Sequence, residues 1–496
     1  MNKNTTHKEA SQPTLFQSVI PIIVLIFLLT LNVLFWDDTL AGSNQMALLL
    51  ASAVGAVISL SLGMDWTKIR EQIVSTIGKS MPAMLILLLI GALSGTWLIS
   101  GVIPTLIYYG LDVLHPKIFL FASVIISAVV SLATGSSWST IATIGVALLG
   151  IGNALGVGEG VTAGAIISGA YFGDKMSPLS DTTNLAPAMA GTDIFTHIRY
   201  MMYTTVPTLS ITLIIFFVMG FTYTFESNPA DITMVKETLS ENFVISPFLM
   251  IVPAFLIFII VKKVSPIPAM LLGSLAGGIF AVIFQPEIIK SIAGISDNYM
   301  KASYITVLQA MYGEVQIESS SKISDLFNTG GMAGMLPTIW LIISAMVFGG
   351  VMESGGMLRR ITLSIIKQVR STGSLVASTA ATCIFFNATA SDQYISVVVP
   401  GRMFHKVYKK YGLKPEVLSR TLEDSGTITS VLIPWNTCGA TQSRVLGVSV
   451  YTYLPYAFFN LLSPFMTVLV AYLNFKIRRT SPEAEEANVN AEDAKE

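Results

Sequence analysis

Residues 173–184 concentrate polar side chains in an otherwise apolar part of the chain. They read GDKMSPLSDTTN and hold two carboxylates, a lysine and several hydroxyl and amide groups. Hard cations such as Na⁺ prefer oxygen ligands of this kind. Gly and Pro also disfavour a continuous helix here, so backbone carbonyl oxygens would be free to bind an ion. We expect the binding residues of this run to be Asp174, Ser177, Ser180, Asp181, Thr182, Thr183 and Asn184, with Asp181 and Asp174 holding Na⁺.

Three further polar segments interrupt apolar stretches and could join the same site. The stretch 118–150 is broken by TGSS, and the stretch 375–400 is broken by NATASD. A third segment combines EDSGT at 423–427 with PWNTCG at 434–439. The candidate residues in these segments are Thr134, Ser136, Ser137, Asn387, Thr389, Asp392, Asp424, Asn436 and Thr437.

Simpler interpretations exist for most of these residues. Asp174, Lys175 and Asp181 could belong to an ordinary cytoplasmic loop, and Ser or Thr in membrane helices often only bonds a neighbouring helix. Asp392 is harder to explain in this way, because a charge at membrane depth is costly and usually functional. Glu423 and Asp424 lie near a basic segment, where one of them could simply be an acid at a helix N-terminus.

The elements that must position these residues are membrane helices. Of the 496 residues, 52% are hydrophobic and 12% are charged, and the mean hydropathy is +0.67. A soluble domain carries roughly 25% charged residues. Several apolar runs reach the ~20 residues that span a bilayer. We therefore expect an all-α polytopic membrane protein in contact with lipid.

The composition also excludes other classes of protein. A net charge of −1 provides no basic face for nucleic acid. No P-loop, HExxH motif or nucleophile elbow occurs. We expect neither an enzyme nor a cofactor.

The distribution of Lys and Arg sets the predicted topology. Both flanks of 375–400 are basic, and positive charge marks the cytoplasmic side. A segment with both ends inside has not crossed, so we interpret 375–400, and 118–150 by analogy, as re-entrant hairpins. About ten transmembrane helices remain, five on each side of the chain's middle. Five is an odd number, so the halves form two inverted-topology repeats, as in many secondary transporters.

Weak internal matches support this duplication. Thr134 matches Thr389 at an offset of 255, and Asp174 matches Asp424 at an offset of 250. We expect the following organisation: a cytoplasmic N-terminal segment at 1–14, a first repeat at 15–223, an extracellular linker at 224–244, a second repeat at 245–475 with a polar extracellular segment at 285–334, and an acidic cytoplasmic tail at 476–496.

The run GDKMSPLSDTTNLAP, with TGSSWST upstream and WNT downstream, resembles the NhaC-type Na⁺/H⁺ antiporter family. The resemblance covers nearly the whole membrane domain, from Leu15 to Phe475. It implies location in the bacterial inner membrane and exchange of Na⁺ for H⁺. The family also includes members similar to malate/lactate antiporters, which couple organic anion exchange to Na⁺ and H⁺.

Our first hypothesis is antiport by alternating access, in which Na⁺ and H⁺ compete for buried carboxylates. A Na⁺- or H⁺-coupled carrier of small carboxylates is the alternative. Against it, no arginine lies securely within a predicted span, although Lys175 could substitute as a point charge. A passive channel is a third class, but the duplication argues for one path per protomer. A homo-oligomer is compatible with the sequence.

Overall fold

The structure is a computed structural model that describes residues 11–36, 42–222, 229–317, 327–367 and 369–480. Residues 1–10 of the expected N-terminal segment and 481–496 of the acidic tail lie outside the described residues. The described chain is helical apart from one small antiparallel sheet, in which β1 (Val315–Gln316) pairs with β2 (Asn328–Thr329). The expected all-α membrane architecture is therefore confirmed.

Among the described residues, eight helical segments are long and apolar enough to cross a membrane. They are α1 (Leu15–Phe35), α2 (Ser43–Ser61), α3 (Trp66–Ile99), α5 (Pro116–Thr134), the continuous α6 (Ser137–Thr140), η2 (Ile141–Gly145) and α7 (Val146–Ala154), α10 (Ile194–Thr222), α13 (Pro266–Phe284), and η5 (Ala333–Met335) with α16 (Leu336–Ser354).

Two bent pairs would raise this number to ten. The first, α11 (Pro229–Asn242) with η3 (Pro247–Met250) and α12 (Ile251–Val261), bends by 89°. The second, α22 (Val450–Tyr453) and η8 (Leu454–Tyr456) with α23 (Phe458–Tyr472), bends by 56°. The total agrees with the expected ten crossings, but it is made up of different segments. It includes both arms of the first hairpin, α5 with 19 residues and the continuous α6–η2–α7 segment with 18, which are long and apolar enough to cross a membrane and which we did not count as crossings.

The remaining helices include the parts of the second hairpin and of two broken helices. The second hairpin consists of α18 (Thr372–Thr389) and α19 (Gln393–Lys410). One broken helix is α8 (Glu159–Met176) followed by α9 (Asp181–Ala190). The other is α20 (Pro415–Leu422), η6 (Glu423–Thr427) and η7 (Ser430–Leu432), followed by α21 (Thr437–Leu446). The shorter helices are α4 (Val102–Val113), α14 (Pro286–Ala293), α15 (Tyr299–Tyr312) and α17 (Met357–Ile366).

The starts of these helices repeat along the chain. The first residues of α5, α6, α8, α9 and α10 recur 256 residues later as the first residues of α18, α19, α20, α21 and α22. This register corrects one of the expected matches, because it places Asp174 opposite Ser430 rather than Asp424. It supports an internal duplication, whereas the inverted orientation of the two halves stays a prediction.

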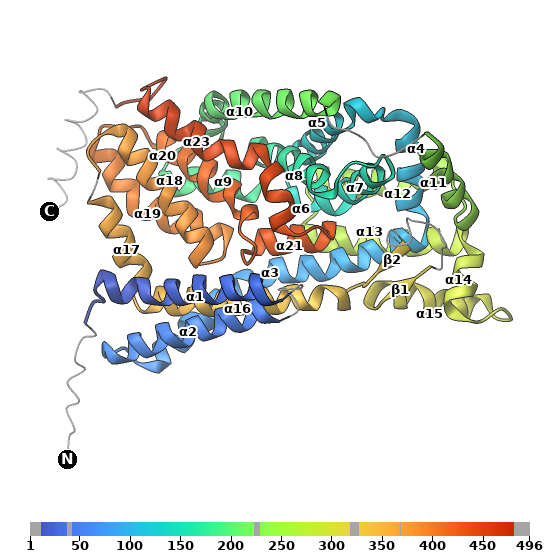
Figure 1. Ribbon diagram of the computed structural model, residues 1–496, viewed down its shortest axis with the longest axis horizontal. Helices are drawn as coiled ribbons and strands as arrows, with labels where there is room; N and C mark the ends of the chain where they lie inside the picture. The colour runs from blue at the N-terminus through green and yellow to red at the C-terminus, as the bar shows by residue number, and fades with distance from the viewer. Residues whose placement is uncertain (1–10, 37–41, 223–228, 318–326, 368, 481–496) are drawn as a thin grey trace, which may run out of the picture.

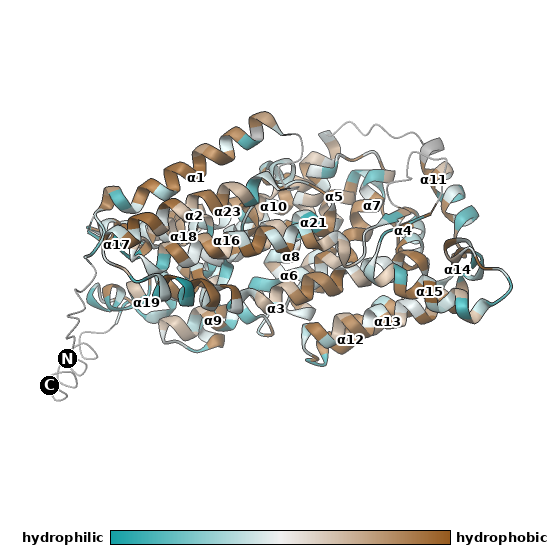
Figure 2. Cartoon of the chain, turned by 90° about the horizontal axis from the view of Figure 1, so that it is seen from below, coloured by the Kyte–Doolittle hydropathy of each residue, from teal (hydrophilic) through white to brown (hydrophobic). Residues whose placement is uncertain are grey.

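The long helices and the broken helices occupy different parts of the molecule. Helix α3 packs against α13 and α16, and α2 packs against α1 and α16. Figure 1 shows this layer running along the long axis, with α6, α8, α9 and α21 on one side of it and α10 and α23 beyond them. In Figure 2 the long helices carry extensive hydrophobic surface. Exposed apolar side chains such as Phe27, Ile214 and Ile279 give α1, α10 and α13 faces suited to lipid.

Candidate ion- and substrate-binding site

Each of the four half-helices at the centre of the fold begins at a residue that the sequence singled out. Ser136 caps α6 and Asp392 caps α19, accepting backbone N–H bonds from Ser139 at 3.2 Å and Ile395 at 3.0 Å. Ser180 caps α9 and Asn436 caps α21. Within each pair the two caps are 256 residues apart. These side chains satisfy backbone donors that a helix start leaves free, so part of their role is structural.

Within the first repeat, Asp174 joins the broken helix to the hairpin. Its Oδ2 accepts hydrogen bonds from the backbone nitrogen of Ser137 at 3.1 Å and from the Ser137 hydroxyl at 2.6 Å. The carboxylate is buried at the end of α8. Gly135 is required at this hairpin tip, because its φ is +70° and a Cβ would lie 2.6 Å from the Cβ of Leu179. The hairpin tip and the unwound segment 177–180 therefore touch, as expected.

The other candidates of the first repeat mostly stabilise the helix break. Thr183 donates from Oγ1 to the backbone carbonyls of Asp174 at 3.1 Å and Lys175 at 3.0 Å. Thr182 bonds the hydroxyl of Ser180 at 3.1 Å. The remaining three have backbone contacts: Ser177 accepts from Leu179, Asn184 donates to Pro178 and Ser180, and Thr134 lies 3.3 Å from the Thr140 hydroxyl besides its bonds to carbonyls.

The second repeat uses amides where the first uses a carboxylate. Asn436 donates from Nδ2 to the backbone oxygen of Asn387 at 3.0 Å and to its Oδ1 at 3.1 Å. Asn387 in turn donates to the backbone oxygen of Gly426 at 2.6 Å. Thr437 donates its backbone N–H to Ser391. Thr389 donates a hydrogen bond to the backbone carbonyl of Phe385 in its own helix at 2.7 Å, so this contact does not connect it to the rest of the site.

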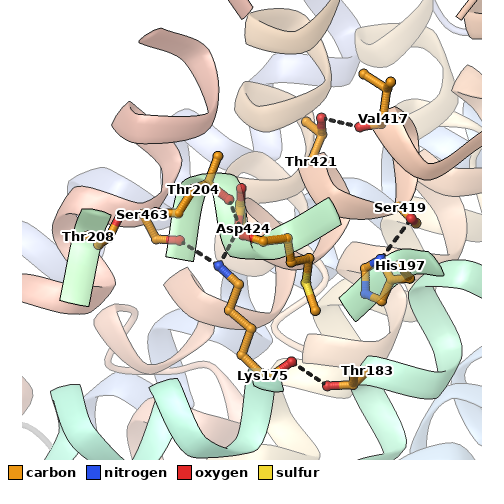
Figure 3. A network of polar contacts seen from close by, with 11 residues as sticks. Lys175, Thr183, His197, Thr204, Thr208, Val417, Ser419, Thr421, Asp424 and Ser463 are labelled. Carbon is orange, nitrogen blue, oxygen red and sulfur yellow. Dashed lines mark hydrogen bonds and ion pairs between the residues drawn. The ribbon is translucent and has the colours of Figure 1, made fainter. Parts of the chain in front are cut away.

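The two repeats cross over each other at the centre. Helix α9 of the first repeat packs against α19, α20 and η6 of the second, and α21 of the second packs against η2 and α7 of the first. A buried ion pair joins the repeats at this crossing, between Lys175 Nζ and Asp424 Oδ1 (Figure 3). Both side chains are fully buried.

Sequence reasoning left Lys175 out of the site. It donates a second hydrogen bond to the Ser463 hydroxyl at 3.3 Å and lies over the Phe459 ring, 5.6 Å from its centroid. The only sequence signal was its position between two aspartates in an apolar region, because its partner Asp424 is 249 residues away. The loop interpretation of Asp174 and Lys175 is therefore wrong, since both are buried in a helix.

Glu423, considered from the sequence only as a possible acid at a helix N-terminus, was not among the expected binding residues. Its side chain is fully buried, and neither carboxylate oxygen has a hydrogen-bond partner among the described residues. It opens η6, a π-helical turn of five residues. Such turns are rare and occur often at functional sites. Glu423 directly precedes Asp424, the ion-pair partner of Lys175, and therefore belongs to the same buried cluster.

Arg420 corrects another expectation, that no arginine lies within a span. It is fully buried on α20, one turn before Glu423 and Asp424. The sequence did not indicate this burial, because Arg420 follows a run of basic residues and could equally have belonged to the same cytoplasmic loop.

Asp181 and Asp392 lie at the edge of the cluster. Asp181, an expected Na⁺ ligand, is exposed at the first turn of α9. Asp392 is buried, and the Ser80 hydroxyl on α3 lies 3.4 Å from its Oδ2. Tyr394, two residues after Asp392 on α19, has a side chain that is 44% exposed. This region is therefore an accessible rim that leads to the buried carboxylates.

No group of three or more His, Cys, Asp or Glu side chains converges to hold a metal ion in the part of the chain that the structure describes. A transported Na⁺ would need backbone carbonyl and hydroxyl oxygens as well as carboxylates, which the unwound segments offer.

Residues 169–475 match the model of the Na⁺/H⁺ antiporter family, a span that begins within α8 and includes α9, the second hairpin and the second broken helix. The chain belongs to this family. It is 36% identical to the Na⁺/H⁺ antiporter NhaC of Alkalihalophilus pseudofirmus, over 87% of this chain and 91% of the relative. The resemblance to NhaC-type antiporters is thereby confirmed.

Two further relatives have other substrates in their names. The malate-2H⁺/Na⁺-lactate antiporter of Bacillus subtilis is 35% identical over 94% of this chain and 96% of its own length. The arginine/ornithine antiporter ArcD of Halobacterium salinarum is 33% identical over 95% and 94%. The family thus combines one scaffold with different transported species, and the family alone does not choose among them.

Proposed function

We propose that this multi-pass membrane protein is a secondary transporter that exchanges Na⁺ for H⁺ by alternating access across a bacterial inner membrane, with both termini in the cytoplasm. The observation that carries the proposal is the buried cluster of Asp174, Lys175, Glu423 and Asp424 between two broken helices. Family membership and the NhaC relatives support the same activity.

The charges of the cluster explain how two cations could compete. Three ionised carboxylates, the Lys175 ammonium and the Arg420 guanidinium one turn before Glu423 would leave one negative charge uncompensated among these buried side chains. Such a charge is costly unless it is paired. Na⁺ and H⁺ can each neutralise it, so binding of one ion displaces the other.

Lys175 determines which carboxylate oxygens are available when no Na⁺ is bound. Its ammonium occupies one oxygen of Asp424, whereas the other oxygen and both oxygens of Glu423 are without partners in the described chain. A Na⁺ ion that enters from the rim at Asp181 would bind these oxygens and backbone carbonyls of the unwound segments. Lys175 and Na⁺ would then share the carboxylates, and the proton that had neutralised one of these carboxylates would leave the cluster.

Proteoliposomes test this function directly. An imposed pH gradient is followed with a pH-sensitive dye while Na⁺, Li⁺, K⁺, malate and lactate are added singly and then in pairs. We expect Na⁺ alone to collapse the gradient. No collapse with Na⁺ under any condition would reject Na⁺/H⁺ exchange. Glu287→Gln on the exposed helix α14 is the matched control for acidic variants, because this side chain is 84% exposed.

Exchange of small carboxylates, coupled to Na⁺ or H⁺, is the second candidate function. The similarity to the malate-2H⁺/Na⁺-lactate antiporter favours it, and so does a buried arginine where none was expected. Gradient collapse only when malate or lactate accompanies Na⁺ would select this function over simple cation exchange.

A further inference from the structure

Arg420 is a fully buried cation without a hydrogen-bonded partner. Its side chain has 0% exposure, and Nε, Nη1 and Nη2 all lack an acceptor among the described residues. A guanidinium carries five N–H donors, and burying them unsatisfied is costly. The carboxylates one turn along, Glu423 and Asp424, do not bond it in this state.

Its surroundings hold the guanidinium in place without neutralising it. The guanidinium lies over the ring of Tyr200 on α10, 4.4 Å from the ring centroid. Stacking of this kind fixes the plane of an arginine and leaves its N–H edge free to bind. The edge of the guanidinium is therefore preorganised toward an acceptor that the described chain does not supply.

A row of side chains connects Arg420 with the surface. Arg478 lies over the same Tyr200 ring at 5.2 Å, pairs with Glu416 at 3.1 Å, and is 40% exposed. His197, one turn before Tyr200 on α10, bonds the Ser419 hydroxyl on α20 at 2.8 Å (Figure 3), and its Nε2 has no partner in the described chain. Arg478 and His197 thus continue the polar contacts of Arg420 between α10 and α20, and Glu416 balances the charge of Arg478 at the exposed end.

We propose that Arg420 binds the carboxylate group of a small organic anion between α10 and α20. Two coplanar oxygens match the guanidinium edge in a bidentate bond, which a single-atom anion or a neutral hydroxyl cannot form. This inference rests on the second candidate function above and names the residue that would recognise its substrate. The site adjoins the cation cluster, because Arg420 lies one helical turn before Glu423 and Asp424.

Binding is measured on the purified full chain in detergent, without Na⁺. The thermal unfolding temperature is recorded with increasing potassium lactate, potassium malate and the uncharged analogue lactamide. We expect a saturable upward shift with lactate or malate and none with lactamide. Unchanged unfolding with both anions in the wild-type protein would overturn the proposal without using any variant.

Three variants locate the site. Arg420→Gln should weaken anion affinity at least tenfold, and Arg420→Lys, which keeps the charge but loses the fork, should fall between it and the wild type. Arg402→Gln, at an exposed position of α19, should bind as the wild type does. Unchanged anion affinity in Arg420→Gln would overturn the assignment, even if Na⁺/H⁺ exchange decreased, because Arg420 would then serve the protein's own carboxylates.

Failure of the carboxylate site at Arg420 can be distinguished from failure of the proposed Na⁺/H⁺ exchange. Na⁺/H⁺ exchange in anion-free proteoliposomes tests the cation cluster alone. Exchange without any anion binding would leave the transport function intact and reject the carboxylate site.

Discussion

Removing one charge of the Lys175–Asp424 pair should destabilise the protein strongly. Both side chains are fully buried, so Asp424→Leu would remove the ion-pair partner of the Lys175 ammonium, which would keep its bond to the Ser463 hydroxyl at 3.3 Å and its position over the Phe459 ring. Stranding one member of a buried pair costs about 3–5 kcal/mol of unfolding free energy. Asp424→Asn should cost less, because its amide oxygen can still accept a bond worth about 0.5–1.5 kcal/mol.

Removing both charges should restore most of that loss. In the double variant Lys175→Met with Asp424→Leu, apolar side chains of similar length replace the pair. Such replacements are often neutral or stabilising by about 1–4 kcal/mol. We therefore expect the double variant to be more stable than either single variant, with a coupling energy of about 3 kcal/mol or more.

A matched surface pair provides the control. Lys290 and Glu287 on α14 lie 3.0 Å apart and are 37% and 84% exposed. The same cycle, with Lys290→Met and Glu287→Leu, should give less than about 1 kcal/mol of coupling. Unfolding in detergent, at one lipid and salt composition, measures all eight proteins. Equal coupling in the two pairs would refute the burial argument, and so would a double variant as unstable as the sum of its singles.

Three further predictions test other parts of the structure. Asp174→Asn should keep the fold, because an amide oxygen can accept both Ser137 bonds, but reduce Na⁺/H⁺ exchange in proteoliposomes at least tenfold; full exchange would remove Asp174 from the site. In α3, Gly95→Ala should lower the free energy of unfolding by at least about 1–3 kcal/mol, since a Cβ would lie 1.8 Å from the Ala310 carbonyl oxygen. Gly78→Ala, with nothing within 4 Å, should be neutral or stabilise by about 0.5–1 kcal/mol, and equal melting temperatures would contradict this contrast. Asn436→Ala should lose about 1–3 kcal/mol in the same measurement, because it removes the cap of α21 and two bonds to Asn387, whereas unchanged stability would show that neither matters.

The sequence was informative wherever the backbone itself had to break. Breaks in apolar stretches need residues that cap the next helix, and Ser136, Ser180, Asp392 and Asn436 are such residues. Local chemistry alone therefore located both hairpin tips and both broken helices. It also predicted the close approach of the tip at Gly135 to the segment 177–180.

Contacts between distant segments were beyond the same reasoning. Nothing local to Lys175 indicates that its partner is Asp424, and a one-sequence comparison matched Asp424 with Asp174 instead. Arg420 and Glu423 were obscured by the basic residues before them, because hydropathy averages over a window and cannot show which face of a short polar helix is buried. The expectation that Asp181 is one of the buried carboxylates is wrong, since it lies exposed at the first turn of α9, whereas its role as a Na⁺ ligand stays a prediction.

The two kinds of contact at the centre have different consequences for movement. Asp174 with Ser137 and Asn387 with Asn436 each lie within one repeat, so a repeat could move while keeping its own contact. Lys175 and Asp424 belong to different repeats, so relative movement of the repeats must lengthen or break their ion pair. Breaking this ion pair leaves two buried charges unpaired unless cations or protons replace Lys175. Reorientation of the ion-free carrier is therefore energetically unfavourable. Coupling between ion occupancy and reorientation is therefore expected from this buried ion pair between the repeats, whichever ion the cluster finally binds.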